Sequence, residues 1–145
     1  MSTPVSFETT IHVRDHCLCL HAQRAARALA RRFDVALRPA GITSGQFSLL
    51  MSLNRPDAPR IGSVANLLAM DRTTLTANLK PLERRGLVEI IPDEKDRRSR
   101  RLVLTEAGRE ALAIAAPIWT SVHATVEAEL GVDPATLRQG LRAIA

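Results

Sequence analysis

The sequence predicts a mainly α-helical protein with one small β-hairpin, an α+β fold. Apolar residues recur every three or four positions over most of the chain, as in amphipathic helices. Two short runs rich in branched residues, 87–91 and 101–104, flank one polar turn and read as a hairpin. Good capping residues precede the helical stretches. A length of 145 residues suits a single domain, residues 1–145.

The composition fits a packed helical core and a polyanionic partner. Hydrophobic residues make up 46% of the chain and aromatic residues 3%, so Leu, Ala, Val and Ile must fill the core. The 20 basic residues exceed the 15 acidic ones, which gives a net charge of +5. No apolar run approaches the roughly 18 residues that span a bilayer, and the N-terminus lacks a secretion signal. We therefore expect a cytoplasmic protein without a membrane partner.

The first predicted helix covers residues 13–38 and follows a loose arm at residues 1–12. Pro39 and Gly41 end this helix. Its apolar face recurs at helical spacing and comprises Leu18, Ala22, Ala25, Leu29, Phe33 and Leu37.

Capping signals divide the middle of the chain. Thr43 and Gln46 form the pattern of a capping box at the start of the second helix. After a loop at 54–59, a third helix opens at Ile61. Asp71 is a good N-cap for a helix over 71–85, which ends at a glycine.

Two more helices follow the hairpin. Thr105 caps a long helix in which Pro117 predicts a bend. Asp133 and Pro134 begin a last helix as N-cap and first helical residue. The apolar faces of 13–38 and 106–145 exceed what a small central core needs, so we expect these dimerisation helices to pack against an identical subunit.

The region 43–104 has the order of parts of a winged helix-turn-helix. The helix 71–85 presents polar side chains of the kind that read base edges, because Arg suits guanine and Asn suits adenine. Its leucines, Leu75, Leu79 and Leu82, would hold it to the core. Pro81 predicts a local kink in this helix. The candidate DNA contacts on the helix are Arg72, Thr73, Thr74, Thr76, Asn78 and Lys80.

The turn of the hairpin adds a second cationic element. Arginine suits the narrow minor groove, so we expect the turn to act as the wing. Asp96 is placed to brace a neighbouring arginine. The candidate contacts in the turn are Lys95, Arg97, Arg98 and Arg100.

Other classes of function remain open at this point. Charge runs are commonly solvated surface, and a winged helix can serve as a non-catalytic protein-interaction module or as a non-specific architectural DNA binder. We expect no enzyme and no cofactor, because the chain has no glycine-rich phosphate loop and no nucleophile–base pair.

The chain resembles the MarR family of transcriptional regulators over nearly its whole length. The segments that carry the resemblance are Asp71–Thr76, Leu82–Val88, Asp93–Ser99 and Leu104–Gly108. The resemblance implies a two-fold dimer of winged-helix subunits, joined through its first and last helices, that binds a pseudo-palindromic operator. It implies that Arg98 or Arg97 enters the minor groove. It also implies a repressor that is released by a small molecule, an oxidant or a metal.

Three hypotheses address the sensing step, beside the reading of both cysteines as small buried residues. Cys19, with its neighbour Cys17, resembles the reactive cysteine of the family's organic-peroxide sensors, although this chain has no tyrosine to stabilise a thiolate. His12, His16 and Cys19 lie at helical spacing and could bind zinc or copper, which would make a metal-responsive repressor. A small aromatic acid could instead bind near His21, Arg24 and Phe47.

Overall fold

The computed structural model describes residues 1–145 as seven α-helices, one 3₁₀ helix and a two-stranded sheet. The elements in chain order are α1 (Phe7–His16), α2 (Leu18–Ala36), η1 (Arg38–Ala40), α3 (Ser44–Leu53), α4 (Ile61–Leu67), α5 (Arg72–Arg84), β1 (Val88–Pro92), β2 (Arg100–Leu104), α6 (Glu106–Glu129) and α7 (Pro134–Ile144).

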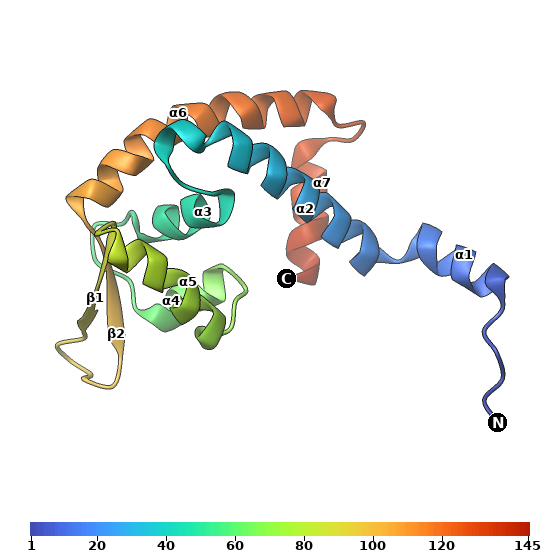
Figure 1. Ribbon diagram of the computed structural model, residues 1–145, viewed down its shortest axis with the longest axis horizontal. Helices are drawn as coiled ribbons and strands as arrows, with labels where there is room; N and C mark the ends of the chain where they lie inside the picture. Colours follow the sequence, from blue (N-terminus) through green and yellow to red (C-terminus); the bar gives the residue numbers. More distant parts are fainter.

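The helices form two groups around the core (Figure 1). In the view of Figure 1, α2 and α6 cross the top of the molecule, while α4, α5 and the hairpin lie below them. Helix α3 lies between the groups and contacts α2, α4, α6 and β2. Helix α1 and the first part of α2 extend away from the body. The hairpin and α5 therefore belong to the same end of the protein.

Aliphatic side chains from both groups form one core. Leu75, Leu79 and Leu82 of α5 are fully buried, which confirms their predicted role in holding this helix. Leu37 and Leu50 meet them from the end of α2 and from α3. Burial of a leucine side chain contributes about 2 kcal/mol, so these contacts fix α5 firmly.

Local capping sets most helix boundaries as predicted. Thr43 and Gln46 form a capping box in which each side chain bonds the other's backbone amide. The side chains of Asp71, Thr105 and Asp133 accept backbone hydrogen bonds at the starts of α5, α6 and α7. These four predictions are confirmed.

Glycine is required at two places between α5 and α6. Gly86 has φ +72°, a left-handed conformation that ends α5 at little steric cost. A Cβ at Gly108 would lie 2.3 Å from the carbonyl oxygen of Leu87. Helix α6 can therefore pack directly on the chain that enters β1.

The N-terminal part differs from the prediction. Residues 7–16 form α1 instead of a loose arm, because the Ser6 hydroxyl accepts a hydrogen bond from the Thr9 amide and caps the helix. The predicted helix over 13–38 is also interrupted at Cys17, whose extended backbone ends α1. The Cys17 thiol then caps α2 by accepting from the Leu20 amide at 3.4 Å. No apolar periodicity marks α1, which has no buried residue.

The first strand of the hairpin lies one residue later than predicted, and the second begins one residue earlier but ends as predicted. Its strands are Val88–Pro92 and Arg100–Leu104, paired antiparallel with Val88 opposite Leu104. The segment before α4 extends this small sheet, since Arg60 forms a β-bridge with Arg101. The hairpin is thus attached to the start of α4 as well as to the core.

Pro81 and Pro117 both lie inside helices. Helix α5 continues through Pro81, and the predicted kink there stays a prediction. Helix α6 continues through Pro117 and curves along its length in Figure 1, and the predicted bend at Pro117 likewise stays a prediction. None of the helices is both long enough and apolar enough to cross a membrane.

Candidate DNA-binding surface

The start of α5 is held by a complete cap. One carboxylate oxygen of Asp71 accepts from the Thr74 amide at 2.7 Å, and the other accepts from the Thr74 hydroxyl at 2.9 Å. These bonds, the backbone one first, lower the pKa of Asp71 below its ordinary value. Asp71 therefore stays ionised at the helix N-terminus, where a negative charge is stabilised.

One face of α5 is exposed and polar. Leu75, Leu79 and Leu82 occupy the opposite, buried side. The exposed residues line a shallow open hollow and comprise Arg72, Thr73, Thr76, Ala77 and Lys80. This face carries two cations, two threonines and an alanine, whose charges, hydroxyl groups and methyl groups together suit phosphate and base-edge contacts in a major groove.

Two of the six residues predicted on α5 lie away from this face. The amide nitrogen of Asn78 lies 3.5 Å from the sulfur of Met70, and Asn78 lines a separate hollow that it shares with α3. Thr74 is engaged in the Asp71 cap. The position of Asn78 could have been predicted from helical spacing. Asn78 lies three residues after Leu75 and four before Leu82, so it neighbours the buried side of the helix.

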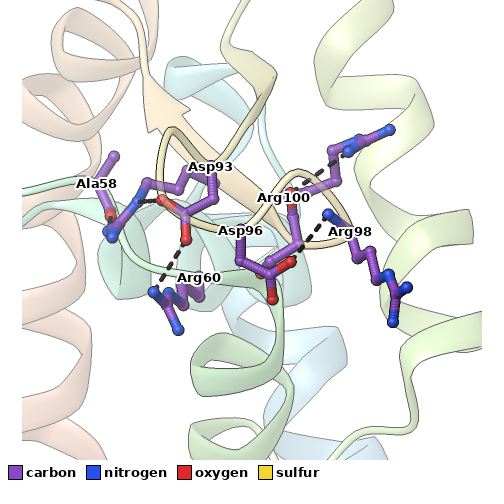
Figure 2. Close-up of polar contacts among 8 residues, drawn as sticks. Ala58, Arg60, Asp93, Asp96, Arg98 and Arg100 are labelled. Atoms are coloured by element: carbon purple, nitrogen blue, oxygen red, sulfur yellow. Dashed lines mark hydrogen bonds and ion pairs between the residues drawn. The ribbon is translucent and has the colours of Figure 1, made fainter.

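The tip of the hairpin gathers exposed cations at the same end of the protein. Lys95, Arg97, Arg98 and Arg100 are all exposed. Figure 2 shows the side chain of Arg98 extending from the turn. Arg100 donates from one guanidinium nitrogen to the carbonyls of Arg97 and Ser99, at 3.0 and 3.3 Å, and thereby stiffens the turn.

Asp96 contacts a neighbouring arginine, as expected, through the backbone of that residue. Its carboxylate accepts from the backbone amide of Arg98 at 3.1 Å (Figure 2). This is the usual bond of an aspartate two residues before the amide in a tight turn. Asp96 therefore shapes the wing tip and fixes the backbone at Arg98.

A second aspartate braces the base of the wing. Asp93, with its side chain 2% exposed, accepts from Nε of Arg101 at 3.0 Å. Its other oxygen forms an ion pair with Arg60 at 2.9 Å, without the geometry of a hydrogen bond. Arg101 also donates to the carbonyl of Ala58 at 2.6 Å (Figure 2).

The pKa of Asp93 is lowered mainly by the hydrogen bond from Arg101, against the opposing effect of burial. Sequence reasoning missed this residue. Its partner Arg60 is distant along the chain. The local signal was the presence of an aspartate at the start of a cationic turn.

The residues predicted to sense an effector are not brought together. Phe47 and Trp119 stack with ring centroids 6.1 Å apart, and they line a hollow of about 300 Å³ between α2, α3 and α6. His21 and Arg24 are exposed and do not line it. The hollow is walled largely by Ala26, Leu29, Ala30, Phe33 and Leu37.

The proposed metal ligands depended on one continuous helix. The helix is interrupted at Cys17, so His12 and His16 belong to α1 and Cys19 belongs to α2. The three residues therefore do not share the helical spacing that suggested the site. The rings of His12 and His16 stack 4.3 Å apart. The structure contains no cluster of three or more potential metal ligands of the His, Cys, Asp and Glu types.

Known proteins share both the sequence and the shape of this chain. The transcriptional regulator MosR from M. tuberculosis, in a structure with DNA, matches with a TM-score of 0.82 and 38% identity over 89% of this chain and 93% of that chain. The sequence model of the MarR family matches residues 42–99. The chain belongs to the MarR family. Its α5 and hairpin thus correspond to the recognition helix and wing of a winged helix-turn-helix regulator.

Two curated MarR-type relatives extend the comparison. The transcriptional activatory protein BadR from Rhodopseudomonas palustris is 36% identical over 64% of this chain and 55% of BadR. The organic hydroperoxide resistance transcriptional regulator from Bacillus subtilis is 30% identical over 63% of this chain and 62% of that protein. The matches therefore span less than two thirds of these relatives.

Proposed function

We propose that this protein is a sequence-specific DNA-binding transcriptional regulator that acts as a homodimer. The observation that carries the proposal is the placement of two cationic elements at one end of the fold. The polar face of α5 and the wing tip are both exposed, while the leucines of α5 are buried and hold it in place. The complex of the similar MosR with DNA supports this assignment.

Each element suits a different groove of the duplex. Helix α5 would enter the major groove, with Arg72, Thr73, Thr76 and Lys80 directed to bases and phosphates. The arginines of the wing tip, Arg97 and Arg98, suit the adjacent minor groove, where the potential is most negative. The net charge of +5 favours association with the phosphate backbone.

Unburied apolar side chains support the homodimer. Helix α7 has no buried residue, and Leu137, Leu141 and Ile144 are 39%, 49% and 71% exposed. Leu18 and Leu29 of α2 are 74% and 41% exposed. Leu137, Leu141 and Ile144 recur at helical spacing and form one exposed apolar face of α7, which monomeric proteins rarely leave uncovered. We therefore assign residues 13–38 and 106–145 to a two-fold interface.

Two routes of control are supported to different degrees. The hollow beside Phe47 and Trp119 suits a flat aromatic group, but no Lys, Arg or His lines it to pair with an acid. Cys19 is exposed and Cys17 is half-buried, so Cys19 is the more accessible to an oxidant. The similarity to a hydroperoxide-response regulator of Bacillus subtilis favours a test of thiol oxidation first.

Fluorescence anisotropy tests the function. Wild-type protein would be titrated on a duplex from upstream of its own gene and on a shuffled duplex of the same composition. Tight binding that prefers the native duplex and weakens steeply with salt supports a specific regulator. Equal binding to both indicates an architectural DNA binder, and no binding indicates a protein-interaction module.

The same titration tests the oxidation route. Organic hydroperoxide would be added stoichiometrically to the wild-type protein and to Cys19→Ser. Release of the wild-type protein alone supports thiol control. Release of neither protein rejects thiol control and leaves the aromatic hollow as the proposed effector site.

A further inference from the structure

The structure assigns to Asp93 a positioning role in DNA binding. By pairing with both Arg101 and Arg60, Asp93 holds the wing at a fixed angle to α4 and α5, so that wing tip and recognition helix reach one duplex together. This inference rests on the proposed DNA-binding function. Asp93 itself lies beneath the surface and would not touch DNA.

The location of Asp93 gives it this role. It follows the last residue of β1 and begins the turn that carries the wing cations, and its backbone amide donates to the carbonyl of Ser99 at 3.1 Å. Arg60 is the N-cap residue of α4, the helix that precedes α5. The Asp93 carboxylate therefore connects the base of the wing tip to the start of the helix-turn-helix (Figure 2).

The chain attaches the wing to this segment along one line of contacts. The carbonyl of Ala58 accepts from the Arg101 guanidinium at 2.6 Å, and the carbonyl of Pro59 accepts from the Leu102 amide at 3.0 Å. A hairpin of two strands is marginally stable by itself. Without the Asp93 pairs, the contacts that remain in this line belong to Arg101 and Leu102 of β2, and the residue that begins the tip loses its ion pair with the start of α4.

The charge pattern makes the carboxylate difficult to replace. Arg101 and Arg60 direct two guanidinium groups at one buried carboxylate, whose side chain is 2% exposed. In Asp93→Asn the remaining oxygen can still accept from Arg101. The new amide would present donors to Arg60, which has only donors itself, so that side of the connection is lost.

The test compares Asp93→Asn with Glu94→Gln. Glu94 is the exposed neighbour, and each change removes one negative charge from the wing. By charge alone, both variants would bind DNA slightly more tightly. We expect Glu94→Gln to do so, and Asp93→Asn to bind about tenfold more weakly, because a loose wing lowers the effective concentration of its arginines at the minor groove.

A coupling measurement separates positioning from general destabilisation. Asp93→Asn would be combined with Arg97→Ala and Arg98→Ala. These two changes remove the cations that the Asp93 tie, the ion pairs of Asp93 with Arg101 and Arg60, is proposed to position. If Asp93 acts through the wing, its substitution has little further effect on affinity in that background. A full tenfold loss in both backgrounds would overturn the inference.

A second variant covers the case in which Asp93→Asn folds poorly. Arg101→Lys keeps the charge but loses the planar guanidinium that joins Asp93 to Ala58. Like Asp93→Asn, Arg101→Lys should weaken DNA binding. It should also reduce the slope of log affinity against log salt. Wild-type affinity in both Arg101→Lys and a folded Asp93→Asn would overturn the positioning role.

The failure of the proposed function is distinguishable. If wild-type protein binds no duplex specifically, the proposed function is wrong. The structural part of the inference is then tested by measuring amide hydrogen exchange of residues 93–101. Faster exchange in Asp93→Asn than in Glu94→Gln supports the tie, and equal exchange rejects it.

Discussion

The Asp71 carboxylate accepts hydrogen bonds from both the backbone amide and the hydroxyl of Thr74, at 2.7 and 2.9 Å. This arrangement closes the first turn of α5, the turn that carries Arg72 and Thr73. The cap thus links the stability of the fold to the shape of the surface proposed to read DNA.

Removal of this cap should weaken both stability and DNA binding. Asp71→Ala leaves the first-turn amides of α5 without a side-chain acceptor, and we expect the melting temperature to fall by about 3 °C. Asp71→Asn keeps an oxygen acceptor and should retain most of the stability. Thermal unfolding followed by circular dichroism measures both, and equal losses in the two variants would contradict the cap.

The same residue predicts an acid-dependent loss of stability. The pKa of Asp71 is lowered in the folded state below its reference value of 3.8. A lowered folded pKa contributes stability above the unfolded pKa, and this contribution is lost as the pH falls through the folded pKa. Wild type should therefore lose unfolding free energy relative to Asp71→Asn as the pH falls below about 4. A difference in urea unfolding that stays constant from pH 7 to pH 3 would contradict this.

The wing predicts a loss of affinity that does not depend on sequence. Arg98→Ala should weaken binding to native and shuffled duplexes alike and reduce the slope of log affinity against log salt by about 1. Arg142→Ala removes the same charge from α7, away from the wing and off the apolar face of Leu137, Leu141 and Ile144, and serves as the control. An unchanged slope in Arg98→Ala would refute the assignment of the wing.

The two sides of α5 predict different effects on specificity. Arg72→Ala should cost about 1–3 kcal/mol on the native duplex, because Arg72 lies on the exposed polar face. Asn78→Ala should leave affinity nearly unchanged, because Asn78 faces Met70 and α3. Anisotropy titrations measure both, and a larger loss in Asn78→Ala would reverse the assignment of the faces.

Helix α7 predicts the oligomeric state. Leu141→Asp places a charge on the unburied apolar face of α7 and should shift the protein toward monomers. Gln139→Asp adds the same charge on the opposite side of the helix and should leave the dimer intact. Sedimentation velocity distinguishes the two. Dimers of undiminished stability in Leu141→Asp would exclude this face from the interface.

Features set by neighbours in sequence could be predicted, and features set by distant residues could not. The caps at Thr43, Asp71 and Thr105 depend on side chains a few residues apart, and all three are present. The break at Cys17 was missed because a cysteine thiol is an uncommon N-cap. The Asp93 pair with Arg60 was missed because it needs the register of β2 against the segment before α4.

Hydroxyl-radical footprinting of wild-type protein on its native duplex tests the central claim most directly. Two bound winged helices predict two sets of protected sites related by a two-fold axis, with their centres about 10 base pairs or a multiple of that apart. The double variant Arg97→Ala, Arg98→Ala should lose the minor-groove protections that the wing gives. It should keep the protections that flank the major-groove contacts of α5. Uniform protection without symmetry, or a footprint unchanged in that variant, would contradict a dimer that reads DNA with α5 and the wing.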